Sequence, residues 1–537
     1  MPKPGKDLHV ADGYRPITLL STLGKTFEKI LNTRIVEHYN EVQPLHQRQF
    51  GFRRGIGTEE AVHQAVDMLR TALSKERAVA GISLDIKGAF DYASWSCILS
   101  SLHDAHTPHY IVNCIKSYFD GRQVHCGTQM KDLNRGCPQG SVLGPTLWNI
   151  VYDHVIRILE RWYPDTCVYA DDTFIIVTAN TAAALKMRVE SCITRVNNIL
   201  AEIGLELSIN KTEVLTRIRK PLWQRVDAGP VEDFHYNVSG TILHPKECIK
   251  YLGVKVDNKL SFRDHLDYII EKSKKRLPLM QGLCRNMYGY QYQARKIMLN
   301  SYILSLLMHC SSIYYQRLQL KTYRQKIEKL QRRTNIIICR AYRSISGMSA
   351  GLLAAEEPLS LHIVERSVHW LIRKGRPVQH WGHLTRVDTD DGLVRDGHPI
   401  TLPEARKLWK EDTLRKWEQE WAEYPLSQWT HSLFPTVESA LNRDWEPSFW
   451  SSQAMTGHGV FKAHLAGRGL ASSDDCPCGF GPETAEHVLR ECLRFTSGRP
   501  PDWSRVTVDH VRYMERTVTR LWEVENPHFK TRRTPSQ

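Results

Sequence analysis

The stretch that decides the fold runs from Cys167 to Val177 and reads Cys-Val-Tyr-Ala-Asp-Asp-Thr-Phe-Ile-Ile-Val. Two apolar, β-prone runs flank a pair of adjacent carboxylates, which predicts a tight hairpin with Asp171 and Asp172 at its exposed tip. Adjacent like charges repel, so a divalent cation, which prefers carboxylate oxygens, is the simplest explanation for the pair. A solvated Asp-Asp turn would also fit these residues taken alone.

A third carboxylate, Asp85, ends a second β-like run that extends from Ala78 to Leu84. Two strands that each deliver an acid at a tip suit a two-metal phosphoryl-transfer site. Phe90, five positions further along, would place an aromatic ring beside whatever the metals hold. Plain core packing would also account for this phenylalanine.

Length and composition narrow the possible classes of protein. A chain of 537 residues is too long for one core and should form two to four domains. The net charge of +14 favours a polyanionic partner, because each neutralised phosphate releases counterions. No apolar run reaches bilayer length, and the first residues lack the apolar core of a secretory signal. We therefore expect an intracellular protein that has no membrane partner.

Further loops and strands surround these acids in the sequence. Gln49 to Thr58 contains three glycines and two arginines before an amphipathic helix, so it could touch phosphates or form a solvated turn. Arg135 to Ser141 precedes another helix, and its second glycine permits close backbone approach. A helix after the hairpin should stop at Gly204, and Leu205 to Ile209 should form a strand. Ile249 to Val256 predicts a hairpin arm.

Taken together, these segments resemble, in order and spacing, the fingers and palm motifs of reverse transcriptases between Tyr14 and Val256. The resemblance is strongest to non-LTR retrotransposons of the jockey-like and arthropod ribosomal-DNA-inserting type. It implies an α+β right-hand polymerase with fingers, an antiparallel palm sheet and a helical thumb. The implied function is RNA-directed DNA synthesis, in which deoxynucleoside triphosphates extend a DNA primer on an RNA template. The rival is a catalytically inactive remnant that still binds nucleic acid.

The resemblance also assigns roles to single residues. It implies that Asp85, Asp171 and Asp172 hold two Mg²⁺ ions, in agreement with the carboxylate chemistry above. Phe90 would be a steric gate that excludes a 2′-hydroxyl and so selects deoxynucleotides. Lys211 matches a lysine that protonates the leaving group. The remaining nucleotide-binding candidates are Gln139 and Gly140, together with Arg53 and Arg54, which could equally be solvated surface residues.

The second half of the chain is predicted to be helical. Basic residues recur from Leu260 onward, as expected of a thumb whose helices meet the phosphates of an RNA–DNA hybrid. Solvated helix faces would explain many of these charges equally well. Six tryptophans from Trp409 to Trp450 predict packed helices, with base stacking as the alternative.

Near the C-terminus four potential metal ligands occur as Cys476-x-Cys478-x8-His487-x4-Cys492. Three thiolates and one imidazole form the tetrahedral set that Zn²⁺ prefers, and the short surrounding segment suggests a structural staple. A zinc knuckle here is also similar in place and order to the C-terminal pattern of the family. The alternative is a set of free side chains, and the one-residue spacing of the first pair is unusual.

These signals predict five segments. Residues 1–258 would form fingers and palm, 259–350 a helical thumb, 351–470 a helical Trp-rich region, 471–500 the zinc knuckle and 501–537 a tail. The first fingers motif lies shortly after Met1, with no endonuclease ahead of it, so we expect an N-terminally truncated product of a longer element. Its action is expected in the nucleus, although no targeting signal stands out.

Overall fold

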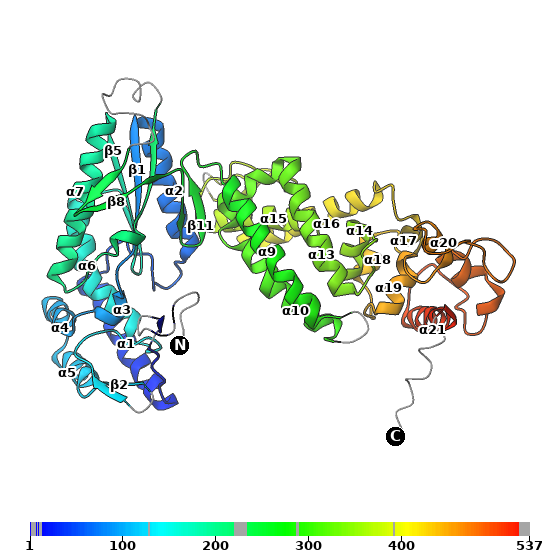
Figure 1. Cartoon of the computed structure of the whole chain (residues 1–537), viewed down its shortest axis with the longest axis horizontal. Coiled ribbons are helices and arrows are strands. Elements are labelled where there is room, and N and C mark those ends of the chain that lie inside the picture. The colour runs from blue at the N-terminus through cyan, green and yellow to red at the C-terminus, as the bar shows by residue number, and fades with distance from the viewer. Residues whose placement is uncertain are drawn as a thin grey trace. The chain divides into compact units, whose positions relative to one another are not determined.

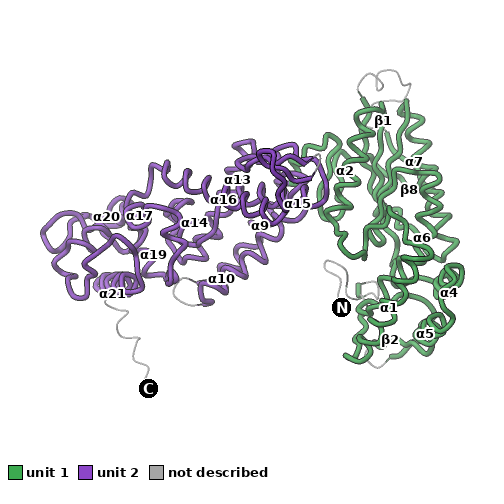
Figure 2. Tube along the Cα trace, turned by 180° about the vertical axis from the view of Figure 1, so that it is seen from behind, with its two compact units in different colours: residues 1–265 green, residues 266–537 purple. Residues whose placement is uncertain are grey.

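The computed structural model describes residues 16–126, 129–219, 234–285, 289–389 and 392–525, and positions 1, 7, 9, 13 and 14. The chain divides into two compact units, Met1–His265 and Leu266–Gln537 (Figure 2). Unit 1 combines helices with a β-sheet, whereas unit 2 is built mainly of helices (Figure 1). The predicted tail, 501–537, lies outside the described residues from position 526 onward.

A five-stranded sheet of order β4-β5-β1-β6-β9 forms the centre of unit 1. Neighbouring strands run antiparallel, except that β6 and β9 pair in parallel over two residues. The predicted antiparallel sheet is therefore confirmed for four strands, and β9 adds a short parallel edge. The strand bounds are Ala78–Leu84 for β1, Thr166–Tyr169 for β4, Asp172–Ala179 for β5, Glu213–Ile218 for β6 and Pro245–Lys246 for β9.

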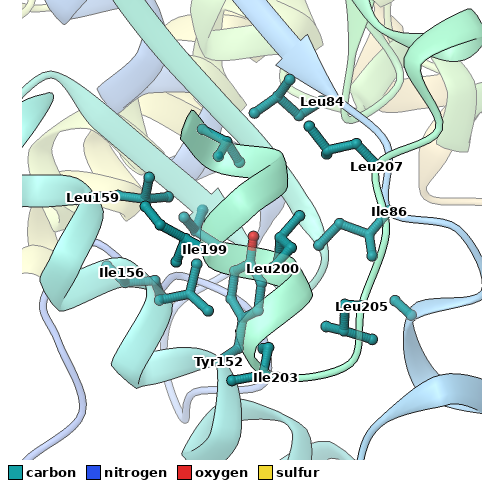
Figure 3. Packing of buried hydrophobic residues seen from close by; sticks show 14 of the residues in the cluster. Leu84, Ile86, Tyr152, Ile156, Leu159, Ile199, Leu200, Ile203, Leu205 and Leu207 are labelled. Carbon is teal, nitrogen blue, oxygen red and sulfur yellow. The ribbon is translucent and has the colours of Figure 1, made fainter. Parts of the chain in front are cut away.

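Helices cover both faces of this sheet, which explains why β1 is apolar along most of its length. On one face, alternate β1 residues pack against α6 (Gly144–Trp162) and α7 (Ala182–Glu202). Figure 3 shows part of this core, with side chains of both helices and with Leu84 at the end of β1 beside Leu207. The other face is covered by α2 (Thr58–Lys75), which lies on the opposite side of the sheet from α7 (Figure 1).

Shorter elements complete unit 1. The helix predicted after the hairpin is α7, and Gly204 follows its end with φ 75°, as expected of a helix stop. The hairpin predicted near Ile249 is confirmed as β10 and β11. The remaining elements are α1 (Thr22–Val42), α3 (Ala89–Tyr92), α4 (Trp95–Asp104), α5 (His109–Phe119), and three hairpins, β2 (Gln123–Cys126) with β3 (Gln129–Asp132), β7 (Tyr236–Val238) with β8 (Thr241–Leu243), and β10 (Cys248–Tyr251) with β11 (Val254–Asp257).

Unit 2 begins within the helix α9 (Arg263–Leu283). It contains a short hairpin, β12 (Val394–Arg395) with β13 (His398–Pro399). Its helices of eight or more residues are α10 (Tyr292–Leu299), α13 (Lys321–Cys339), α14 (Gly347–Ala354), α15 (Leu359–Arg373), α16 (Leu402–Ala422), α19 (Phe449–Thr456) and α21 (Val508–Glu525). Its shorter helices are α11 (Ser305–Met308), α12 (Ser311–Tyr314), α17 (Gln428–Leu433), α18 (Val437–Leu441) and α20 (Lys462–Ala466).

Tryptophans organise the interior of unit 2. Trp409, Trp417 and Trp421 project from α16 and are buried. The indole N–H of Trp421 donates to the carbonyl of Phe434 at 2.9 Å, so its one polar atom is satisfied. Core packing therefore accounts for these α16 rings.

Within the described residues no single helix is long and apolar enough to cross a membrane. The bent pair Tyr292–Met308 and Ser311–Gln319 is long and apolar enough only when its two helices are taken together.

Candidate active site and metal centre

The predicted hairpin consists of β4 and β5, with Tyr169 paired to Asp172 where the two strands meet the turn. The two-residue turn is Ala170–Asp171, so Asp172 is the first residue of β5. Ala170 adopts a left-handed backbone conformation, with φ 59°, of the kind that tight hairpin turns use. The predicted tip was therefore wrong by one position: Asp171 lies in the turn and Asp172 in the strand.

Asp85 reaches the same end of the sheet from β1. The register pairs Leu84 with Thr173, so the next position of each strand places Asp85 opposite Asp172. The backbone carbonyl of Asp85 accepts a hydrogen bond from Ser208 N–H at 2.8 Å, which fixes the chain beyond the strand. The neighbouring strands β1 and β5 thus bring the three predicted carboxylates to the same end of the sheet.

The three acids are close enough to affect one another's ionisation. Burial of its carboxyl group, together with the negative charges of Asp171 and Asp85, raises the pKa of Asp172 to about 6. Asp172 nevertheless keeps solvent access at the strand end, so a hydrated cation can reach it. Three carboxylates that repel one another, at a point open to water, suit hard divalent cations.

Lys211 lies at the same end of the sheet, because its Nζ is 2.9 Å from Asp85 Oδ2. The predicted strand from Leu205 to Ile209 is wrong: only Leu207 forms a bridge, to the chain beside Asp85, and Ile209–Lys211 form one 3-10 turn. Both members of this ion pair are partly exposed, so solvent screens it and it contributes little to stability.

Phe90 stands at the end of an aromatic column that is anchored in α6. Its ring stacks on Trp148, with centroids 5.1 Å apart and planes at 24°, and Trp148 stacks on Tyr152 at 5.2 Å. Phe52 meets the Phe90 ring edge-on at 5.8 Å. The Tyr152 hydroxyl bonds the Thr173 hydroxyl at 2.8 Å, directly beside Asp172 in the chain. The column therefore fixes Phe90 relative to the strand that carries the acids.

The loop that contains Gln139 and Gly140 is held from two sides. Its Cys137 N–H donates to the Phe90 carbonyl at 2.6 Å, and Thr18 N–H donates to the Gln139 carbonyl at 2.8 Å. Gly140 has φ 105°, and a Cβ there would lie 2.5 Å from the Thr18 carbonyl oxygen, so glycine is required. The structure joins this loop to Phe90, and the role of Gln139 and Gly140 at a nucleotide stays a prediction.

Glu28, which the sequence reasoning missed, supports this loop from α1. Glu28 is 5% exposed, and its carboxylate accepts hydrogen bonds from Ser141 Oγ and Val142 N–H, each at 2.7 Å. These donors lie at the start of α6, where a negative charge is favoured by the helix dipole. An acid on the apolar side of an amphipathic helix, next to Leu31 and Ile35, was the available signal.

The two predicted arginines differ in their surroundings. Arg53 Nη1 donates to the carbonyls of His46 at 3.2 Å and Gln49 at 3.1 Å, so its guanidinium braces its own loop. Arg54 is exposed. The structure does not bring either side chain into contact with the carboxylates, and their role at a triphosphate stays a prediction.

The four predicted zinc ligands converge in unit 2. The ligand atoms of Cys476, Cys478, His487 and Cys492 all lie within 4.8 Å of one another. Cys476 Sγ lies 3.7 Å from Cys492 Sγ, and Cys478 Sγ lies 3.2 Å from His487 Nε2. Tetrahedral Zn²⁺ with Zn–S bonds of about 2.3 Å requires sulfur atoms about 3.8 Å apart. The donor set therefore fits zinc.

The surroundings of these ligands also suit a metal. His487 Nδ1 lies 3.2 Å from Glu491 Oε2, and such an outer carboxylate orients a ligating imidazole. Desolvation opposes ionisation of Cys478, yet hydrogen bonds from the Phe480 backbone and from neighbouring ligands lower its pKa to about 7. Cys476 and Cys492 belong to the same hydrophobic core as the α16 tryptophans Trp417 and Trp421. The ligands therefore lie in a core that this segment shares with the rest of unit 2.

Comparison with known proteins agrees with this geometry. Residues 1–256 match the family model described as reverse transcriptase (RNA-dependent DNA polymerase). A retrovirus-related Pol polyprotein from the type-1 retrotransposable element R1 of Bradysia coprophila is 26% identical over 487 residues, covering 89% of this chain and 46% of that protein. The RNA-directed DNA polymerase from the mobile element jockey of Drosophila funebris is 27% identical over 292 residues, covering 52% of this chain and 31% of that protein.

The chain thus spans about half the length of the R1 relative. It spans about a third of the length of the jockey relative. Among solved structures, apo telomerase from Candida tropicalis matches 64% of this chain and 58% of that chain, with 10% identity and a TM-score of 0.32. A likeness that weak carries no argument about this chain. The sequence matches do: residues 1–256 are similar to the reverse transcriptase family, and the chain is similar to polyproteins of the R1 and jockey retrotransposable elements.

Proposed function

We propose that this chain is an RNA-directed DNA polymerase that extends a DNA primer on an RNA template by two-metal nucleotidyl transfer. The observation that carries the proposal is the convergence of Asp85, Asp171 and Asp172 at one end of the palm sheet, with Lys211 2.9 Å from Asp85. Similarity to reverse transcriptases over residues 1–256 makes an RNA template the expected partner.

Two Mg²⁺ ions held by the three carboxylates would supply charge neutralisation at the triphosphate and activation of the primer 3′-hydroxyl. Lys211 would leave Asp85 and donate a proton to the departing pyrophosphate, which its exposed position allows. Phe90 would lie beneath the sugar of the deoxynucleoside triphosphate and exclude a 2′-hydroxyl. Gln139 and Gly140 would line the nucleotide pocket, with the loop backbone close to the substrate.

Unit 2 would hold the RNA–DNA hybrid and stabilise its own fold with zinc. Basic residues recur along α9 and α13, such as Lys275 and Arg333, and they suit contacts with phosphates rather than bases. A structural Zn²⁺ on Cys476, Cys478, His487 and Cys492 would tie the C-terminal segment into the core that it shares with the tryptophans.

An inactive nucleic-acid-binding remnant is the alternative function. The supports of the site, as well as its acids, are in place: the aromatic column holds Phe90, and Glu28 holds the start of α6. These intact supports favour an enzyme over a remnant.

Primer extension on an RNA template distinguishes the two functions. With deoxynucleoside triphosphates and Mg²⁺, the purified chain should extend an annealed DNA primer. Asp171→Asn should abolish extension and leave template–primer affinity nearly unchanged, because it removes a metal ligand and little volume. A partly exposed acid of unit 1, Asp67, which pairs with Arg70 on α2, provides the control Asp67→Asn. Binding without extension by the unaltered chain would favour the remnant, and wild-type rates for Asp171→Asn would refute the site.

A further inference from the structure

A short segment outside the named strands lies along the free edge of β4. Val168 N–H donates to the Arg48 carbonyl at 2.9 Å, and Phe50 N–H donates to the Val168 carbonyl at 2.8 Å. The residue between them, Gln49, forms a parallel bridge with Val168. The chain before α2 is thus paired with the strand that leads directly into the metal-binding turn.

The side chain of Gln49 continues this pairing around the turn. Gln49 is 1% exposed, and its Oε1 accepts hydrogen bonds from Ala170 N–H at 2.9 Å and Gly51 N–H at 2.8 Å. Its Nε2 donates to the Ala170 carbonyl at 3.3 Å. One side-chain amide therefore pairs both polar groups of the Ala170 backbone, as a neighbouring strand would. Ala170 is the residue with φ 59°, and Asp171 follows it.

Neighbouring residues hold the Gln49 amide in this position. A Cβ at Gly51 would lie 2.2 Å from Ala170 N, so only glycine allows the segment to approach the turn. The buried side chain of Asn149, on α6, donates to the Gly51 carbonyl at 2.9 Å. Arg53 donates to the backbone carbonyl of Gln49 at 3.1 Å. The amide is thus fixed from α6 and from its own loop.

We propose that Gln49 is a positioning residue for the cation site: its amide holds the Ala170 turn so that Asp171 and Asp172 face Asp85. This inference rests on the proposed function and deepens it. The amide touches neither substrate nor cation and acts through the backbone that orients the first ligand. Residues that orient metal ligands in this way change metal affinity or activity by about 10- to 100-fold when they are replaced.

Gln49→Met tests the role, because methionine fills a similar volume without the three hydrogen bonds. The half-saturating Mg²⁺ concentration for primer extension should rise about 10-fold or more, and kcat should fall by about 10- to 100-fold. KM for the deoxynucleoside triphosphate and affinity for template–primer should stay within about twofold, because Phe90 and the Gln139 loop do not contact Gln49. Gln47→Met, at an exposed position of the same loop, is the matched control and should change none of these.

A second readout is independent of catalysis. In metal-free protein, backbone amide hydrogen exchange of the peptide from Val168 to Thr173 should accelerate in Gln49→Met, since Ala170 N–H loses its acceptor. If this variant does not fold, Gln49→Glu keeps the acceptor for Ala170 N–H but leaves the Ala170 carbonyl without its donor, so its half-saturating Mg²⁺ concentration for extension should also rise. No extension by the unaltered chain would refute the proposed function. Wild-type extension combined with unchanged Mg²⁺ dependence and exchange in the variant would refute the positioning role alone.

Discussion

Replacing Phe90 by valine should admit ribonucleotides. The ring stacks on Trp148 at 5.1 Å and meets Phe52 edge-on at 5.8 Å, and aromatic pairs of this kind contribute about 0.5–1.5 kcal/mol each. With the lost apolar area of a half-buried ring, we expect Phe90→Val to lower the free energy of unfolding by about 1–3 kcal/mol. That loss is below the 5–15 kcal/mol typical of a folded domain, so the variant should remain testable.

The effect on sugar choice should exceed the effect on folding. A pocket that discriminates by shape against one added group gains about 1–3 kcal/mol, or about 10- to 200-fold. In Phe90→Val, the ratio of kcat/KM for a deoxynucleotide to kcat/KM for the matching ribonucleotide should decrease by about 10- to 200-fold. Single-nucleotide incorporation on one primed RNA measures it, with Phe27→Val on the exposed side of α1 as the control. An unchanged ratio in folded Phe90→Val would refute the gate and leave Phe90 as a packing residue.

Three further outcomes are expected. The raised pKa of Asp172, about 6 without metal, means that protons compete with cations below this pH. The half-saturating Mg²⁺ concentration for extension, titrated between pH 5 and 8, should therefore rise as pH falls through 6, and a flat profile would contradict this. Elemental analysis should find one zinc per chain, and Cys476→Ser with Cys478→Ser should remove it and lower the melting temperature of unit 2, while extension on a short primed template persists. Glu28→Gln should raise KM for the nucleotide more than it lowers kcat in steady-state extension, because the carboxylate that holds the backbone at the start of α6 is lost. An equal effect on KM and kcat would count against this supporting role of Glu28.

Local patterns predicted much of this site correctly. The β1 strand has the expected bounds, Ala78–Leu84, because its apolar run is long enough to be recognised and Asp85 ends it. The spacing from Cys476 to Cys492 predicted a four-ligand cluster because the chelate geometry is local. Such signals depend on neighbouring residues, and single-sequence reasoning is strongest for them.

Long-range contacts account for the errors. The turn at Ala170 shifted by one residue because a partner 121 positions away, Gln49, stabilises its left-handed backbone. Glu28 bonds Ser141 across 113 positions, and a sequence pattern cannot show that pair. Leu205 to Ile209 alternates like a strand, yet only Leu207 forms a β-bridge there. In each case the choice of partner was decided by tertiary packing.

The most direct test of the cation site is a crystal structure of the chain with primed RNA template, a non-hydrolysable deoxynucleotide and Mn²⁺ in place of Mg²⁺. Anomalous scattering should show two Mn²⁺ peaks about 3.5–4 Å apart, coordinated by carboxylate oxygens of Asp85, Asp171 and Asp172. Lys211 should have left Asp85 for the triphosphate. No peak at these three acids, or peaks held only by other residues, would contradict the proposed two-metal site.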